Sequence, residues 1–212
     1  MFSICTAYIE NGKIEETLKQ TSKSEANFTE VIGVKFRKFF QCKIQPHILW
    51  SLTEWESEKQ HHTAAQSIMK TRYDDRFASI AFGPEPYFEI FCEEDEDIKI
   101  GTFSEKYELV IVIHVLIGEK VKEKYLELRK SRIEDHRNKI PWLRIFNNKY
   151  NSFEFVAYIG FHSEKEFNNI RQVKELFLEE YLFTGLRKPL DMSFIASYNQ
   201  FFCTPINLSV KL

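Results

Sequence analysis

The chain has 212 residues and nearly balanced charge, with 29 Lys and Arg against 31 Asp and Glu and a formal net charge of −2. Apolar residues make up 43% and charged residues 28%, which is ordinary for a folded globular protein. This composition excludes a disordered or collagen-like chain and lacks the basic surface that a nucleic-acid partner requires. The 20 Phe predict a well-filled core, and the 7 Gly form no G-x-G-x-x-G or G-x-x-x-x-G-K-S/T phosphate loop.

Cysteine usage and hydropathy predict a reduced protein without a membrane span. No C-x-x-C motif occurs among Cys5, Cys42, Cys92 and Cys203, and the N-terminus lacks the basic and apolar segments of a secretory signal. The longest apolar run, residues 109–117, is far shorter than the roughly 20 residues that span a bilayer. We therefore expect free thiols, a cytoplasmic location and no membrane partner, with residues 109–117 forming a buried strand.

The first half of the chain alternates strand-like and helix-like segments. Runs rich in β-branched and aromatic residues predict strands at 1–9, 34–42, 47–55 and 86–93. A helical segment is predicted after the first strand, over about 13–27, and a long helix begins at Ser57. Ser57 and Gln60 fit the S-x-x-E/Q capping box that opens many helices.

The same series of elements returns 106 residues later. The predicted strands are 107–117, 140–148, 153–161 and 192–199, and the predicted helices are 119–133 and a segment after Ser163. Ser163 and Glu166 repeat the capping box. Because the identity between the halves is low, the repeat lies in the order of the elements rather than in matching residues.

Each half therefore has the order β-α-β-β-α-β of a ferredoxin-like unit. We predict an α+β fold with one unit over 1–93, an acidic linker over 94–105 and a second unit over 106–212. We expect the charged run 93–97 to lie in solvent.

Several predicted strands, above all residues 109–113, are apolar on both faces. The face that the helices leave bare then needs cover. The favoured cover is the other half of the chain, in an intrachain pseudo-dimer of the dimeric α+β barrel type. A homodimer through the same faces is the alternative.

Two neighbouring histidines follow the third predicted strand. His61 precedes Ala64 and Ile68 at helical spacing and should be buried, either as a core histidine with a hydrogen-bond partner or as a general base. Phe167 stands at the matching position of the second half. His62 should point toward the rim and solvent.

Aromatic and polar strand residues complete the candidate site. Trp50 and Trp55 differ by an odd number and should point to opposite faces of their sheet, and Trp55 is a candidate for the pocket or for core packing. Tyr8 and His114 hold matching strand positions, and two interpretations stay open: they line a shared cavity, or they pack in the core. No H-E-x-x-H, H-x-H or Cys/His cluster predicts a metal site.

With this element order, the stretch 52–62 (LTEWESEKQHH) resembles the antibiotic biosynthesis monooxygenase-like group of the dimeric α+β barrel superfamily. The resemblance is best over residues 1–93. It implies a pocket beside the sheet, in which some members oxidise aromatic substrates without a cofactor and others degrade haem. Trp55 matches the tryptophan of the haem-degrading members, but Thr6 stands where they carry Asn and Ala65 where they carry the axial histidine.

The resemblance implies a monooxygenase that uses no cofactor and acts on a small apolar or aromatic substrate. His61 would be the catalytic base, and the substrate-binding candidates are Trp55, Tyr8, His114 and His62. In such an enzyme the protein deprotonates a phenolic substrate and holds it near oxygen in a dry cavity. Two alternatives stay open: a protein that binds a small ligand or haem without turnover, and a structural or interaction module.

Overall fold

A computed structural model describes residues 1–10, 12–19, 33–64, 66, 88–172 and 195–206. These residues form an α+β fold that divides into two compact units. The first unit consists of Met1–Glu93 and the C-terminal residues from Cys203, and the second consists of Glu94–Phe202. None of the helices in the described ranges is long and apolar enough to cross a membrane.

The first unit is built on a sheet with the strand order β4-β1-β3-β2. Its strands are β1 (Phe2–Tyr8), β2 (Val34–Cys42), β3 (Ile48–Trp55) and β4 (Phe88–Glu94), whose last residue already belongs to the second unit. The central strand β1 pairs antiparallel with β3 on one side and with β4 on the other. Helical residues 14–19 follow β1, and helical residues 58–64 and 66 follow β3.

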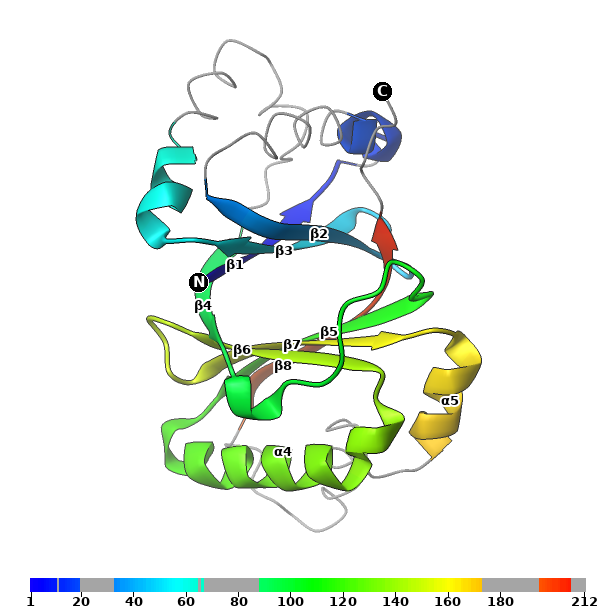
Figure 1. The fold of residues 1–212 in the computed structure, drawn as a ribbon. Coiled ribbons are helices and arrows are strands. Elements are labelled where there is room, and N and C mark those ends of the chain that lie inside the picture. The colour runs from blue at the N-terminus through cyan, green and yellow to red at the C-terminus, as the bar shows by residue number, and fades with distance from the viewer. Residues whose placement is uncertain (11, 20–32, 65, 67–87, 173–194, 207–212) are drawn as a thin grey trace. The chain divides into compact units, whose positions relative to one another are not determined.

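The second unit has the strand order β8-β5-β7-β6. Its strands are β5 (Leu109–Ile117), β6 (Trp142–Asn148), β7 (Glu154–Phe161) and β8 (Ile195–Ile206). Its helices are α4 (Lys122–His136) and α5 (Glu164–Gln172), with short 3-10 turns η1 (Glu96–Ile98), η2 (Glu119–Val121) and η3 (Arg137–Lys139). Figure 1 shows α4 lying along one face of this sheet.

The predicted strand over 109–117 is confirmed as β5, with most of its side chains buried. The tandem ferredoxin-like units and the pseudo-dimer stay predictions. Much of the predicted helical sequence, within 20–32, 67–87 and 173–194, lies outside the described residues.

The last predicted strand ends too early. The sequence predicts a strand over 192–199, whereas β8 continues to Ile206 and its last four residues pair with β2. Cys203 lies directly opposite Cys42, and Pro205 lies opposite Phe40. The pairing is a long-range contact, which local sequence patterns do not report.

Odd-numbered residues of β5 form the core beneath the helices of the second unit. Leu109, Ile111, Ile113, Val115 and Ile117 are buried in one cluster with Phe155, Phe161 and Phe167. Tyr125 and Leu126 of α4 pack against this cluster. Successive strand side chains point to opposite faces, so these five aliphatic residues share one face of β5. This apolar face packs against the helices.

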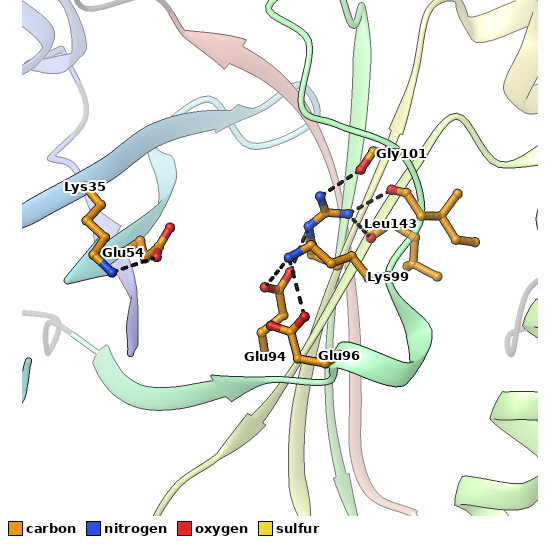
Figure 2. Close-up of polar contacts among 9 residues, drawn as sticks. Lys35, Glu54, Glu94, Glu96, Lys99, Gly101 and Leu143 are labelled. Carbon is orange, nitrogen blue, oxygen red and sulfur yellow. Dashed lines mark hydrogen bonds and ion pairs between the residues drawn. The ribbon is translucent and has the colours of Figure 1, made fainter. Parts of the chain in front are cut away.

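The acidic run after β4 is not simply solvated. Glu93, Glu96 and Asp97 are exposed as expected, but the Glu94 carboxylate pairs with the Arg144 guanidinium at 2.8 Å and Asp95 pairs with Arg129. Lys99 bonds Glu94 at 3.1 Å and approaches Glu96 at 3.6 Å, which Figure 2 shows. The run therefore begins the second unit, because its carboxylates are ion-pair partners of that unit's cations.

Arg144 fixes the loop that follows this run. Its guanidinium donates hydrogen bonds to the carbonyls of Ile100, Leu143 and Gly101 at 2.7–2.8 Å. Gly101 has a φ of +59°, and a Cβ there would lie 2.0 Å from the Pro141 carbonyl oxygen. Only glycine fits this close approach between the loop and the start of β6.

Candidate functional site

The helix that carries His61 begins with the predicted capping box. The Gln60 amide donates to Ser57 Oγ at 3.3 Å, and the Ser57 hydroxyl bonds Gln60 Oε1 at 3.0 Å. The cap fixes the first helical turn and thereby sets which side chains face the sheet. His61 is only 8% exposed, which confirms its predicted burial. The side chain of His62 is 57% exposed, which confirms the prediction that it points toward solvent.

His61 bonds a carboxylate that the sequence did not single out. Its Nε2 lies 2.9 Å from Oε1 of Glu89, which comes from β4. Both side chains are largely buried, with exposures of 10% and 19%. A buried imidazole requires a hydrogen-bond partner, and Glu89 supplies it.

Glu89 stands at the centre of a small polar network. Burial by itself raises the pKa of Glu89, but hydrogen bonds from His61, Cys5 and Ser3 outweigh it and leave the pKa below its ordinary value. The Cys5 thiol donates to Glu89 Oε1 at 3.3 Å. Ser3 accepts a 2.9 Å hydrogen bond from Trp55 Nε1. Glu89 is therefore an ionised carboxylate at neutral pH, held by three donors.

Strand register explains why these side chains meet. Glu89 lies opposite Cys5, and Ser3 lies opposite Phe91, in the β1–β4 ladder. These residues have the same parity along their strands and therefore project from the same face of the sheet. That face meets the helix of His61, because the Trp55 and Phe91 rings both contact the His61 ring.

Two aromatic rings enclose the imidazole. The centroid of the His61 ring lies 4.9 Å from that of Trp55 and 4.8 Å from that of Phe91, both in edge-to-face geometry. The predicted placement of Trp55 beside His61 is thus observed. Trp50 has the opposite parity on β3 and lies on the other face, as predicted.

The second nitrogen of His61 is the notable feature of the site. Nδ1 is buried and has no hydrogen-bond partner among the described residues. Because the ionised Glu89 can only accept, the proton of a neutral imidazole belongs on Nε2, and Nδ1 keeps its lone pair. The arrangement leaves one basic nitrogen in an apolar setting with its acceptor capacity unused.

The second unit fills the matching positions with apolar side chains. Phe161 and Phe167 stand where Trp55 and His61 stand relative to the capping serine, and their rings pack at a centroid distance of 5.5 Å. The facing residues of β5 are aliphatic. A phenylalanine pair therefore suffices to build this junction, and the polar network of the first unit is more than the fold requires.

Two predicted substrate-binding residues do not join the His61 network. Tyr8 is at the far end of β1, opposite Ile48, and its parity differs from that of Ser3 and Cys5. It therefore projects from the other face of the sheet. His114 belongs to β5 of the second unit, so the cavity that it was predicted to share with Tyr8 stays a prediction.

His114 has its own carboxylate partner. Its Nε2 lies 2.7 Å from Oε1 of Glu154, and the Asn148 amide donates to Oε2 of the same carboxylate at 2.6 Å. Hydrogen bonding from His114 lowers the pKa of Glu154, with a further contribution from Asn148, against the effect of burial. His114 faces away from the helix-side core, because its strand neighbours Ile113 and Val115 point into that core.

The described residues do not fit a haem or metal site at His61. They contain no group of three or more His, Cys, Asp or Glu side chains that could hold a metal ion. Ligation of a haem iron through Nε2 would break the bond to Glu89 and leave a buried carboxylate without its partner. We therefore derive no chemistry through haem.

No family model and no curated protein matches the chain. Comparison with solved structures finds an anthrone oxidase-like protein with a TM-score of 0.71 and 8% identity, over 100% of this chain and 94% of that one. A candidate monooxygenase of Fusobacterium nucleatum has a TM-score of 0.68 and 12% identity, over 97% and 92% of the two chains. A candidate monooxygenase of Lactobacillus acidophilus has a TM-score of 0.63 and 9% identity, over 96% and 92%.

These likenesses cover nearly the whole chain at very low identity, so they establish the fold and not the activity. They confirm the predicted α+β fold class. The choice of candidate site residues is supported by the geometry alone.

Proposed function

We propose that the chain is a monooxygenase-type enzyme that uses no cofactor and acts on a small aromatic substrate with an acidic hydroxyl or an enolisable C–H group. The observation that supports this proposal is the His61–Glu89 pair, with Nδ1 of His61 buried and unused. The structural neighbours include a protein named for anthrone oxidation and two candidate monooxygenases, which favours this reaction class over other uses of a histidine base.

The proposed base is Nδ1 of His61. A substrate hydroxyl that donates to Nδ1 would satisfy this nitrogen, and proton transfer would create an imidazolium beside the Glu89 carboxylate. Glu89 would stabilise that positive charge through Nε2 and hold the imidazole in the tautomer that accepts at Nδ1. Glu89 is thus a positioning residue, and His61 is the group that touches the substrate.

The electron-rich substrate anion would then react with dioxygen. For an anthrone, O₂ supplies one oxygen atom to the quinone carbonyl and the other leaves as water, so the substrate itself supplies the electrons. The aromatic walls Trp55 and Phe91 suit a flat apolar substrate, since aromatic rings prefer offset or edge-to-face contact. Exclusion of water by these rings would strengthen the charge–charge contact at the base.

The test is oxygen uptake by the purified full chain with anthrone as the probe, read together with quinone formation. The His61→Phe variant introduces the residue type found at the matching position of the second unit, Phe167. It should lower kcat at least about 100-fold, the scale of a lost general base. The Glu89→Gln variant should lower kcat at least about tenfold, because His61 then loses its charged partner. The exposed neighbour Glu93 gives the matched control, and Glu93→Gln should keep wild-type uptake.

Three outcomes would contradict the proposal. Equal rates for the wild type and His61→Phe would remove His61 as the base. Tight binding of the probe without oxygen uptake would favour the non-catalytic ligand-binding alternative. A Soret band on addition of haem that His61→Phe abolishes would show that His61 serves as a haem ligand instead.

A further inference from the structure

Two cysteines face each other across a strand pair in the first unit. Cys42 ends β2 and Cys203 lies in the C-terminal part of β8, and the two residues are direct partners in the antiparallel register. Directly opposed residues have Cα atoms about 4.5–5.5 Å apart, which falls within the roughly 4.4–6.8 Å that a disulfide spans. Their thiols are reduced and hydrogen-bonded to one another.

The surroundings of the two sulfurs differ. The hydrogen bond from Cys203, backbone hydrogen bonds from Gln45 and Ile44, and the nearby His47 lower the pKa of Cys42 to about 6 despite its burial. The bond to Cys42 and burial raise the pKa of Cys203. Cys42 is therefore the thiolate of the pair at neutral pH, and Cys203 keeps its proton.

Access to the pair selects the kind of oxidant. Cys42 is 3% exposed and Cys203 is fully buried. A bulky disulfide such as oxidised glutathione cannot approach sulfurs at this depth without opening the sheet. A hydroperoxide is small enough to reach Cys42 from the exposed turn 43–46 that follows it.

We propose that Cys42 and Cys203 are a peroxide-sensitive pair that closes a reversible cross-strand disulfide between β2 and β8. The Cys42 thiolate attacks one oxygen of the hydroperoxide, forming a sulfenic acid and releasing hydroxide or an alkoxide. The Cys203 sulfur then displaces the sulfenic oxygen, which leaves as water with the Cys203 proton. With hydrogen peroxide, two thiols and one oxidant give one disulfide and two waters.

The other cysteines are not placed for this reaction. Cys5 donates its thiol hydrogen bond to the ionised Glu89, which disfavours a second negative charge at its sulfur. Cys92 is buried on β4, where its register partner on β1 is Phe2. Neither has a cysteine opposite it in a strand ladder of the described residues.

The experiment uses the full chain, reduced and then treated briefly with hydrogen peroxide before denaturation and alkylation with N-ethylmaleimide, which then reaches every free thiol. We expect two of the four thiols to escape alkylation, a linked peptide that joins Cys42 to Cys203, and full recovery of alkylation after dithiothreitol. Alkylation of all four thiols, or a linkage between any other pair, would overturn the proposal.

Variants separate the roles of the two sulfurs. Cys203→Ser should leave a Cys42 sulfenic acid that a dimedone probe labels, whereas Cys42→Ser should give neither the label nor the disulfide. Cys92→Ala is the matched buried control and should form the disulfide as the wild type does. Equal labelling of Cys42→Ser and Cys203→Ser would contradict the assigned order of attack. If a variant fails to fold, the peptide map of the wild type still decides whether the disulfide forms.

Discussion

Among single residues, Glu89 carries a charge that depends on its neighbours. Its hydrogen bonds to His61, Cys5 and Ser3 hold its pKa below the ordinary value of 4.5. A carboxyl whose pKa is lowered on folding stabilises the folded state above its unfolded pKa, and this stabilisation fades as pH falls through the folded pKa. The Glu89→Gln variant removes the effect.

We therefore expect Glu89→Gln to lower the free energy of unfolding at pH 7 by about 1–3 kcal/mol, the scale of a hydrogen bond to a charged group. The gap to the wild type should stay full above the ordinary pKa of 4.5 and shrink as the pH falls through the lowered pKa of folded Glu89. Urea unfolding at a series of pH values measures it. Glu93→Gln, on the same strand but exposed, should change the stability by no more than about 0.5 kcal/mol at any pH. A gap that does not vary with pH would contradict the assigned charge state.

The sequence could place His61 and Trp55 because their positions follow from periodicity. Helical spacing put His61 on the buried stripe, and the odd separation of Trp50 and Trp55 put them on opposite faces. Glu89 could not be found in this way, since it lies 28 residues from His61 and on another element. The one local signal was a single carboxylate between apolar residues on β4, which sequence patterns also allow at a solvated strand position.

At the scale of elements, helix capping sets the orientation of the helices. The amide of Glu166 donates to Ser163 Oγ at 3.1 Å, and Glu166 Oε2 accepts from the His162 amide at 2.7 Å. At both helix starts the serine Oγ accepts from the amide three residues on, as predicted, whereas the return bonds join the Ser57 hydroxyl to Gln60 and the His162 amide to Glu166. Local signals of this kind are readable from sequence because both partners lie within a few residues.

Loss of the cap should cost stability without touching the core. We expect Ser163→Ala to lower the free energy of unfolding by about 1 kcal/mol, since the Glu166 amide loses its side-chain acceptor. Ser152, an exposed turn residue, gives the control, and Ser152→Ala should stay within about 0.5 kcal/mol of the wild type. Equal losses for the two variants, measured by urea unfolding, would show that the cap contributes nothing at α5.

The ends of elements were harder to predict than their existence. The strand β8 runs on to Ile206 because β2 pairs with it, and the acidic run 93–97 is drawn into ion pairs with Arg129 and Arg144. Both features depend on partners far away in the chain. The sequence patterns favoured a shorter strand and a solvated linker there, and long-range pairing overrode both preferences.

At the scale of the whole molecule, the two units allow the stability of a polar junction to be compared with that of an apolar one. The second unit packs Phe161 against Phe167 where the first unit packs Trp55 against His61. Burying the Glu89 carboxylate costs desolvation free energy, and well-packed apolar side chains of similar volume often give equal or greater stability than such a polar contact. The network in the first unit is therefore better explained by function than by stability.

This comparison predicts opposite outcomes for single and double variants. His61→Phe should destabilise the protein by about 3–5 kcal/mol, because Glu89 stays buried without its partner. The double variant His61→Phe with Glu89→Leu should have a free energy of unfolding that equals that of the wild type or exceeds it by up to about 4 kcal/mol. It should not turn over substrate. Thermal unfolding and oxygen uptake measure the two properties. A double variant that is less stable than His61→Phe would contradict a functional origin for the pair.

The order of strands and the resemblance to the α+β barrel superfamily were accessible from sequence, because alternating apolar runs and turn residues mark each element. The partnership of His61 with Glu89, the placement of Tyr8 on the other face and the Cys42–Cys203 pairing were not. Each depends on strand register or helix–sheet packing, which no local pattern encodes.

The most direct test of the proposed base is the tautomer of the neutral His61 ring, read by long-range ¹H–¹⁵N NMR. We predict that this ring carries its proton on Nε2 and leaves Nδ1 bare, and that Glu89→Gln loses this preference. A proton on Nδ1 in the wild type, unchanged in the variant, would contradict the proposed base and the catalytic reading of the site.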